Sequence, residues 1–258
     1  MGAGGGLTRF LGAGVFQVPR LYPIIDRETL DERGIGVGEF AAELAAAGVR
    51  MVQYRDKVGG PQVVLRGAAA VSAAFAGRDC VLVMNDRADL AVLAGWRAVH
   101  VGQGDLGVED VRRVLGGTGE VRERNVRNVF AIYAMGVVGV STHTAEQVRA
   151  VCEPTSRKNR DVGHPAQDDS RDGPDYVAIG PVFATGTKAD AEPVVGLEGV
   201  RRARALTRRP LVAIGGITLG NARSVVEAGA DSLAVISGLF VEGRTVGDVV
   251  RDFVRVLG

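Results

Sequence analysis

The sequence of 258 residues has few cysteines, almost no net charge and no long apolar run. Its two cysteines, Cys80 and Cys152, lack the spacing of a metal site, and neither is a candidate nucleophile. Such sparse cysteine predicts a reduced, cytoplasmic protein. The formal net charge of +1 gives no electrostatic reason to expect nucleic acid as a partner.

No apolar run approaches the roughly 20 residues that a membrane-spanning helix needs, so we expect no membrane association. Residues 1–18 are rich in glycine and alanine, but no basic stretch precedes an apolar one there, and we expect no secretory signal. They are predicted to form a flexible extension.

Hydrophobic residues, in contrast, make up 46% of the chain, enough for one large core. Eight near-continuous apolar runs are typical of parallel strands buried on both faces. They span residues 21–25, 49–53, 81–84, 98–101, 137–140, 176–179, 211–214 and 233–236. Amphipathic, helix-like segments lie between most of them, for example at 40–47, 63–75, 145–151, 197–206 and 221–228.

This alternation predicts an α/β protein with a closed (β/α)8 TIM barrel as its single domain over residues 19–258. The structural alternative is an open doubly wound sheet, which usually has fewer strands and one dominant glycine fingerprint. Two polar stretches near 116–128 and 153–174 interrupt the alternation of strand-like and helix-like segments. They are predicted to be loop insertions, either plain surface loops or lids.

Polar or glycine-rich residues follow seven of the eight runs. The second run leads into Gln53, Arg55 and Lys57, which the period of an extended chain places on one side. They would converge on one point, although an isolated pattern of this kind also fits a solvated charge cluster. Asp86 and Asp105 follow the third and fourth runs, and two such acids suit Mg²⁺ better than Zn²⁺. Asp86 could equally cap the helix that follows.

The later strand ends carry features of anion sites. Ser141 and His143 follow the fifth run, a loop with two threonines and Lys188 follows the sixth, and glycine or serine follows the last two. Hydroxyls, an ammonium and close backbone approach suit phosphate groups. Helix capping would also explain Ser141, and His143 could be a packed or solvent-facing histidine. We expect His100, within the fourth run, to pack in a barrel layer.

These motifs resemble those of the thiamine phosphate synthase family: Q-x-R-x-K, N-D, G-Q-x-D, a serine-histidine turn, G-P-x-x-x-T-x-T-K, I-G-G-I and a late I-S. The likeness runs from about Leu21 to Phe240, interrupted by the two insertions. The chain departs from the family at Tyr54, where an apolar residue such as leucine is usual, in its long loops and in its glycine-rich start.

The resemblance implies Mg²⁺-dependent condensation of a pyrimidine diphosphate with a thiazole phosphate, with Arg55, Lys57 and Lys188 as catalytic residues and Asp86 and Asp105 holding the metal. It also implies a homodimer. The substrate-binding residues that it implies are Gln53, Tyr54, Arg55, Asp56, Lys57, Asn85, Ser141, Thr185, Gly186, Thr187, Lys188, Gly216, Ile236 and Ser237.

Two other functions stay open. A related barrel, the thiazole tautomerase, transfers a proton and has a histidine at the position of His143, but it needs neither paired metal ligands nor the Gln53, Arg55 and Lys57 set. A non-catalytic barrel that binds a phosphate ligand is the second alternative.

Overall fold

The computed structural model describes residues 16–116, 136–153, 173–186 and 193–258. Within them eight parallel strands form a closed barrel in sequence order, because β8 pairs with β1 as well as with β7. The strands are β1 (Leu21–Asp26), β2 (Met51–Arg55), β3 (Val81–Asn85), β4 (Ala98–Val101), β5 (Val137–Thr142), β6 (Tyr176–Ile179), β7 (Leu211–Ile214) and β8 (Ser232–Val235). The predicted TIM barrel is confirmed, and the open sheet is excluded.

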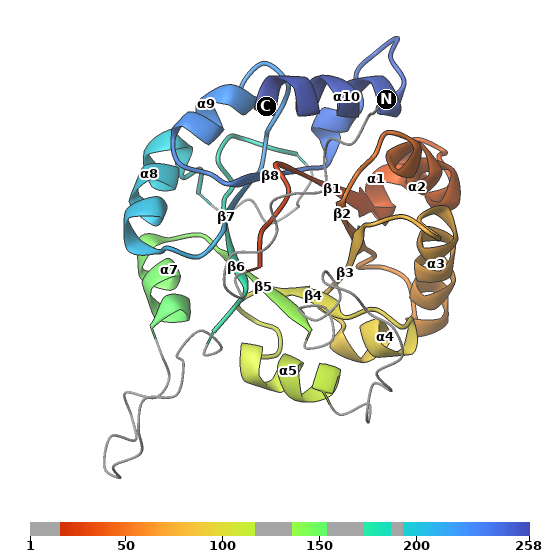
Figure 1. The fold of residues 1–258 in the computed structure, drawn as a ribbon, viewed down its shortest axis with the longest axis horizontal. Coiled ribbons are helices and arrows are strands. Elements are labelled where there is room, and N and C mark those ends of the chain that lie inside the picture. Colours follow the sequence, from red (N-terminus) through yellow and green to blue (C-terminus); the bar gives the residue numbers. More distant parts are fainter. Residues whose placement is uncertain (1–15, 117–135, 154–172, 187–192) are drawn as a thin grey trace, which may run out of the picture.

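Helices surround the barrel on the outside (Figure 1). They are α1 (Arg27–Glu32), α2 (Val37–Ala46), α3 (Pro61–Ala74), α4 (Ala88–Leu93), α5 (Val108–Gly116), α7 (Ala145–Cys152), α8 (Gly196–Leu206), α9 (Ala222–Glu227) and α10 (Val246–Leu257), with a 3-10 helix η3 (Ser237–Leu239) after β8. None of the described helices is long and apolar enough to cross a membrane.

Three strands have the bounds predicted from the sequence, β1, β3 and β5 run one or two residues further at the carboxyl end, and β2 and β8 are shifted at both ends by two residues and one residue. The second strand begins at Met51 and not at Val49, because Val49 still belongs to the turn that ends α2. There Gly48 takes a left-handed conformation, with φ of 81°, and the Val49 amide donates to the Leu44 carbonyl at 3.2 Å.

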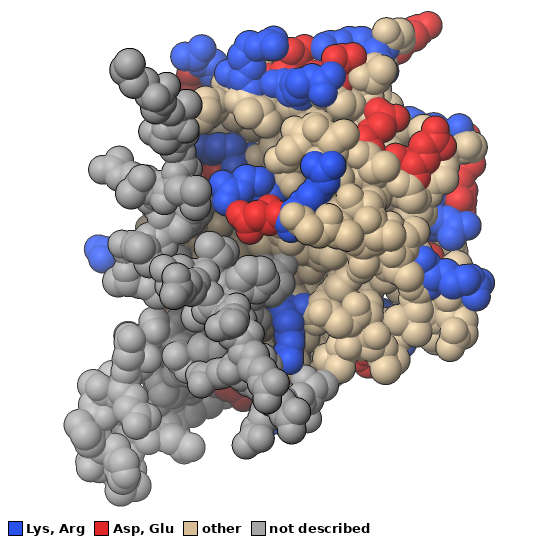
Figure 2. Space-filling model, turned by 45° about the vertical axis from the view of Figure 1, so that its right-hand side comes forward, with Lys and Arg blue, Asp and Glu red and all other residues tan. Residues whose placement is uncertain are grey.

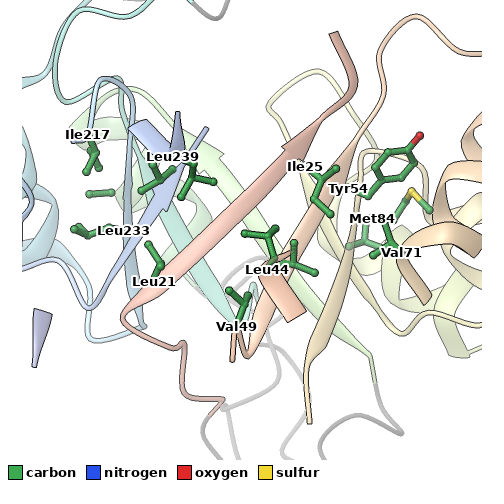
Figure 3. Packing of buried hydrophobic residues seen from close by; sticks show 14 of the residues in the cluster. Leu21, Ile25, Leu44, Val49, Tyr54, Val71, Met84, Ile217, Leu233 and Leu239 are labelled. Atoms are coloured by element: carbon green, nitrogen blue, oxygen red, sulfur yellow. The ribbon is translucent and has the colours of Figure 1, made fainter. Parts of the chain in front are cut away.

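The hydrophobic core has two layers. The outer layer lies between the strands and the helices, where Tyr54 and Met84 of the barrel wall approach Val71 of α3 (Figure 3). The inner layer fills the barrel and includes Tyr22 and Tyr176. A filled interior leaves the ends of the barrel as the place for a site.

The expected extension and insertions fall largely outside the described residues, which omit 1–15, 117–135 and 154–172. Phe16 is described, and it packs with the inner layer, with its ring centroid 6.2 Å from that of Tyr176. The part of the extension next to the barrel is therefore in contact with it.

Charged side chains of both signs lie next to each other on the face shown in Figure 2. Elsewhere in the described chain, charged side chains form ion pairs one helical turn apart, such as Arg113 with Asp110 on α5 and Arg251 with Asp248 on α10. The mixture agrees with the net charge near zero.

Candidate active site

The carboxyl end of β2 presents a cation held by a buried acid. Arg55 ends the strand and contacts the carboxylate of Asp26, the last residue of β1. The Asp26 and Arg55 side chains are only 1% and 13% exposed, and Glu28 approaches Arg55 at 3.6 Å. Arg55 is thus a fixed cation at the barrel mouth, and it is not a solvated surface charge.

Lys57 and Asp86 form a second ion pair at the barrel mouth, between the segments that follow the neighbouring strands β2 and β3. The Lys57 ammonium contacts the Asp86 carboxylate, which follows β3. Asp86 has φ of 59°, whereas every other positive φ in the described chain belongs to glycine. Such a conformation costs a non-glycine residue on the order of 1–3 kcal/mol and is concentrated at functional sites. Asp86 does not cap α4, because Arg87 occupies that position.

The Asp86 carboxyl also lies beside Asp105. Burial raises the pKa of Asp86 above its ordinary value, the Lys57 ammonium lowers it, and the neighbouring Asp105 carboxylate raises it again. Asp105 accepts a hydrogen bond from the Gly102 amide at 2.8 Å, which fixes its loop. The structure therefore brings together the two acids predicted as metal ligands.

Two adjacent carboxylates and a nearby cation fit a magnesium site better than a zinc site, since oxygen is the ligand that Mg²⁺ prefers. Among the described residues, no three His, Cys, Asp or Glu side chains cluster closely enough to hold a metal. Asp86 and Asp105 are the two residues that would hold a magnesium ion here.

A chain of hydrogen bonds crosses the barrel interior below this end. The Gln53 amide nitrogen donates to the Tyr22 hydroxyl at 2.9 Å, and that hydroxyl lies 3.0 Å from the hydroxyl of Tyr176. His100 continues the chain, with Nδ1 3.1 Å from the Tyr176 hydroxyl and Nε2 2.8 Å from Ser141 Oγ. The chain links Gln53 and Ser141, two predicted site residues on opposite parts of the barrel.

A pocket opens at the carboxyl ends of β5 to β8. Six residues among those that line it matter for the chemistry: Ser141, His143, Thr185, Gly216, Ile236 and Ser237. Ser141 does not cap α7, because Thr144 does so through its hydroxyl. His143 Nδ1 lies 2.7 Å from the Gly180 carbonyl oxygen, which can only accept, so Nδ1 carries a proton.

Glycine is required at the wall of this pocket. Gly216 has φ of 63°, and a Cβ built on it would lie 2.6 Å from the Ala184 carbonyl oxygen and 2.7 Å from Phe183 Cβ. The loops after β6 and β7 therefore touch here, which leaves backbone close to any ligand in the pocket.

Tyr54 and Asp56 lie away from the mouth. Tyr54 is fully buried on the outer face of β2, where its hydroxyl donates to Asp56 at 3.2 Å (Figure 3). Asp56 also accepts from the amides of Val58 and Gly59, at 3.2 and 2.6 Å. These bonds hold the loop that carries Lys57. Tyr54 and Asp56 therefore support the position of Lys57 without facing the barrel mouth.

The remaining predicted residues are at its edge or beyond the described chain. Asn85 is the last residue of β3, next to Asp86, and Gly186 is exposed after Thr185. Thr187 and Lys188 lie outside the described residues.

Sequence reasoning missed Asp26 and the two interior tyrosines. Asp26 follows the only run without a recognised polar motif, and the signal that could have found it is an aspartate directly after a strand, a residue type that favours the N-cap of a helix. Tyr22 and Tyr176 lie inside apolar runs and gave no polar signal.

Comparisons with known proteins show which family this chain resembles over most of its length. A family model described as thiamine monophosphate synthase matches residues 21–121 and 119–239. The thiamine-phosphate synthase of Koribacter versatilis is 41% identical over 243 residues, which cover 93% of this chain and 97% of that protein. That of Methanoregula boonei is 35% identical over 220 residues, 83% of this chain and 85% of that protein. Among solved structures, the thiamine phosphate pyrophosphorylase from Pyrococcus furiosus has a TM-score of 0.66 and 25% identity, covering 92% of this chain and 95% of that one.

Proposed function

The chain belongs to the thiamine monophosphate synthase family and is a transferase, and we propose the reaction that it catalyses. It joins 4-amino-2-methyl-5-(diphosphooxymethyl)pyrimidine to 4-methyl-5-(2-phosphooxyethyl)thiazole, giving thiamine monophosphate and pyrophosphate. The observation that carries the proposal is the adjacency of a cation and carboxylate cluster to a glycine-walled pocket at one barrel end. Two phosphorylated molecules that must react with each other need such neighbouring sites.

The diphosphate binds over β2 to β5. Arg55 and Lys57 supply positive charge there, and both are already positioned by the acids Asp26 and Asp86. Gln53 and Ser141 bound the same region from the barrel interior. Lys188 adds a third cation and Asn85 a further polar contact.

Asp86 and Asp105 would hold Mg²⁺, which would supply positive charge to neutralise the diphosphate. The site fits that ion because the two carboxylates are adjacent.

The thiazole phosphate binds in the pocket after β5 to β8. Gly216 lets backbone approach the anion, and Thr185 and Ser237 supply hydroxyls. We also assign Gly186, which follows Thr185, and Thr187, which is outside the described residues, to this phosphate. Ile236 contributes an apolar wall for the ring.

The reaction breaks the bond between the pyrimidine methylene carbon and the diphosphate oxygen, and the electron pair leaves with pyrophosphate. The methylene cation that remains is stabilised by the aminopyrimidine ring, and the thiazole nitrogen lone pair captures it to form the new carbon–nitrogen bond. No enzyme nucleophile is consumed. The cations around the leaving group lower the barrier because they meet charge that grows in the transition state.

A tautomerase remains the second candidate, because His143 lines the pocket with Nδ1 committed to the Gly180 carbonyl. Its Nε2 is then the atom that would exchange a proton with a ligand.

The test is product analysis with purified protein. With both substrates and Mg²⁺ we expect thiamine monophosphate, and with a chelator we expect almost none. If the protein instead isomerises a thiazole carboxylate phosphate, it is the tautomerase. If it binds the thiazole phosphate but converts nothing, it is a binding barrel.

Sedimentation velocity tests the homodimer that we also propose.

A further inference from the structure

We propose that the interior hydrogen-bond chain runs in one direction and makes the Ser141 hydroxyl a donor toward the diphosphate. Tyr22, Tyr176 and His100 are then positioning residues that act through Ser141. The inference deepens the proposed function and rests on it for the identity of the anion. The direction starts from the contact of Gln53 with Tyr22 and does not depend on the anion.

The direction that we propose starts from the Gln53 amide nitrogen, which donates to the Tyr22 hydroxyl. Tyr22 then turns its single proton toward the Tyr176 hydroxyl, 3.0 Å away. The Tyr176 hydroxyl accepts that proton and donates its own to His100 Nδ1. His100 is therefore neutral with its proton on Nε2, and it donates to Ser141 Oγ.

Ser141 is the end of the chain. Because its oxygen accepts from His100, its own proton is left for a ligand, and Ser141 stands on β5, where the proposed diphosphate region meets the pocket. A hydroxyl that donates is what a diphosphate oxygen needs, since the anion has only acceptors. If Gln53 presented its oxygen to Tyr22, every bond would reverse, and Ser141 would offer only lone pairs to the anion.

The barrel is shaped to hold this chain. Tyr22 and Tyr176 are 1% and 0% exposed, and burial raises the pKa of both, so their hydroxyls stay protonated. The Tyr22 and Tyr176 rings meet edge to face at 6.0 Å, and His100 stacks on Tyr176 at 5.6 Å. Gly139 of β5 makes the room, because a Cβ built there would lie 2.0 Å from the Tyr176 ring.

The first test is the tautomer of His100, read from the nitrogen shifts of ¹⁵N-histidine protein at neutral pH. The sequence has three histidines, so His143→Gln and His164→Gln variants assign the signals. We expect His100 neutral with its proton on Nε2. A proton on Nδ1, or a charged ring, would overturn the proposal. This measurement needs no turnover, so it stands apart from whether the protein makes thiamine monophosphate.

The second test is Tyr176→Phe, which removes the middle hydroxyl and keeps the ring. We expect His100 to lose its preference for the Nε2 proton, and inorganic pyrophosphate to bind roughly threefold to tenfold more weakly, the effect of about one hydrogen bond. The KM for the thiazole phosphate should not change. Phe16→Leu is the matched control, because Phe16 packs against the Tyr176 ring without joining the chain. Equal losses in the two variants would mean that packing alone matters and would refute the relay.

Discussion

Asp26 and Arg55 form a buried ion pair that joins the ends of β1 and β2. Asp26 also accepts from the Thr29 amide at 3.0 Å and from its hydroxyl at 2.7 Å, so one carboxylate begins α1 and fixes Arg55. The side chains of Asp26 and Arg55 are both largely shielded from solvent. The geometry of the proposed diphosphate site therefore depends on Asp26, which no sequence motif indicated.

Asp26→Asn should impair diphosphate binding. The substitution keeps the shape but removes the charge that holds a mostly buried guanidinium, and breaking a buried pair costs about 3–5 kcal/mol at most. We expect a higher KM for the pyrimidine diphosphate, a lower kcat and a lower melting temperature. Asp31→Asn is the control, since Asp31 pairs with Arg27 on the exposed side of α1. Steady-state kinetics that are unchanged in Asp26→Asn would contradict the role.

Tyr54 and Gly67 should couple energetically. A Cβ on Gly67, within α3, would lie 2.0 Å from the Tyr54 hydroxyl, so Gly67→Ala should destabilise the protein by about 1–3 kcal/mol through overpacking. In a Tyr54→Leu background the same change should stabilise by roughly 0.5–1 kcal/mol, because alanine favours a helix. Urea denaturation of the four proteins gives the cycle, and an effect of the same sign in both backgrounds would rule out the contact.

Asp105→Ala should weaken the binding of Mg²⁺. Its carboxylate lies beside that of Asp86, and we assign both to the ion. We expect turnover to fall and the Mg²⁺ concentration for half-maximal rate to rise at least tenfold. Asp110→Ala removes an exposed acid of α5 and serves as the control. Normal turnover of Asp105→Ala at limiting Mg²⁺ would remove it from the metal site.

Gly216→Ala should close the thiazole phosphate pocket. The added methyl group meets the Ala184 carbonyl and Phe183, and φ of 63° disfavours alanine there. Isothermal titration with the thiazole phosphate should show a loss of affinity of at least tenfold, with pyrophosphate affinity unchanged. Gly220→Ala, with nothing nearer than 3.8 Å, is the control in the same loop. Tight binding to Gly216→Ala would place the phosphate elsewhere.

The strand pattern and the strand-end motifs were readable from the sequence because parallel strands are continuous apolar runs and their ends bear the chemistry. What local pattern could not give was partnership. The alternation that puts Gln53 and Arg55 on one side already turns Tyr54 outward to α3, but the bond between its hydroxyl and Asp56 is seen only in the structure. Asp26, Tyr22 and Tyr176 act through residues far along the chain, so only the closed barrel brings them to Arg55, Gln53 and His100.

The central claim is tested most directly by following the phosphorus signals of the purified protein mixed with both substrates and Mg²⁺. The account predicts that one pyrophosphate and one thiamine monophosphate appear for each pyrimidine diphosphate consumed, and that neither appears when Mg²⁺ is chelated. Unchanged signals of both substrates, with the folded protein and Mg²⁺ present, would contradict it.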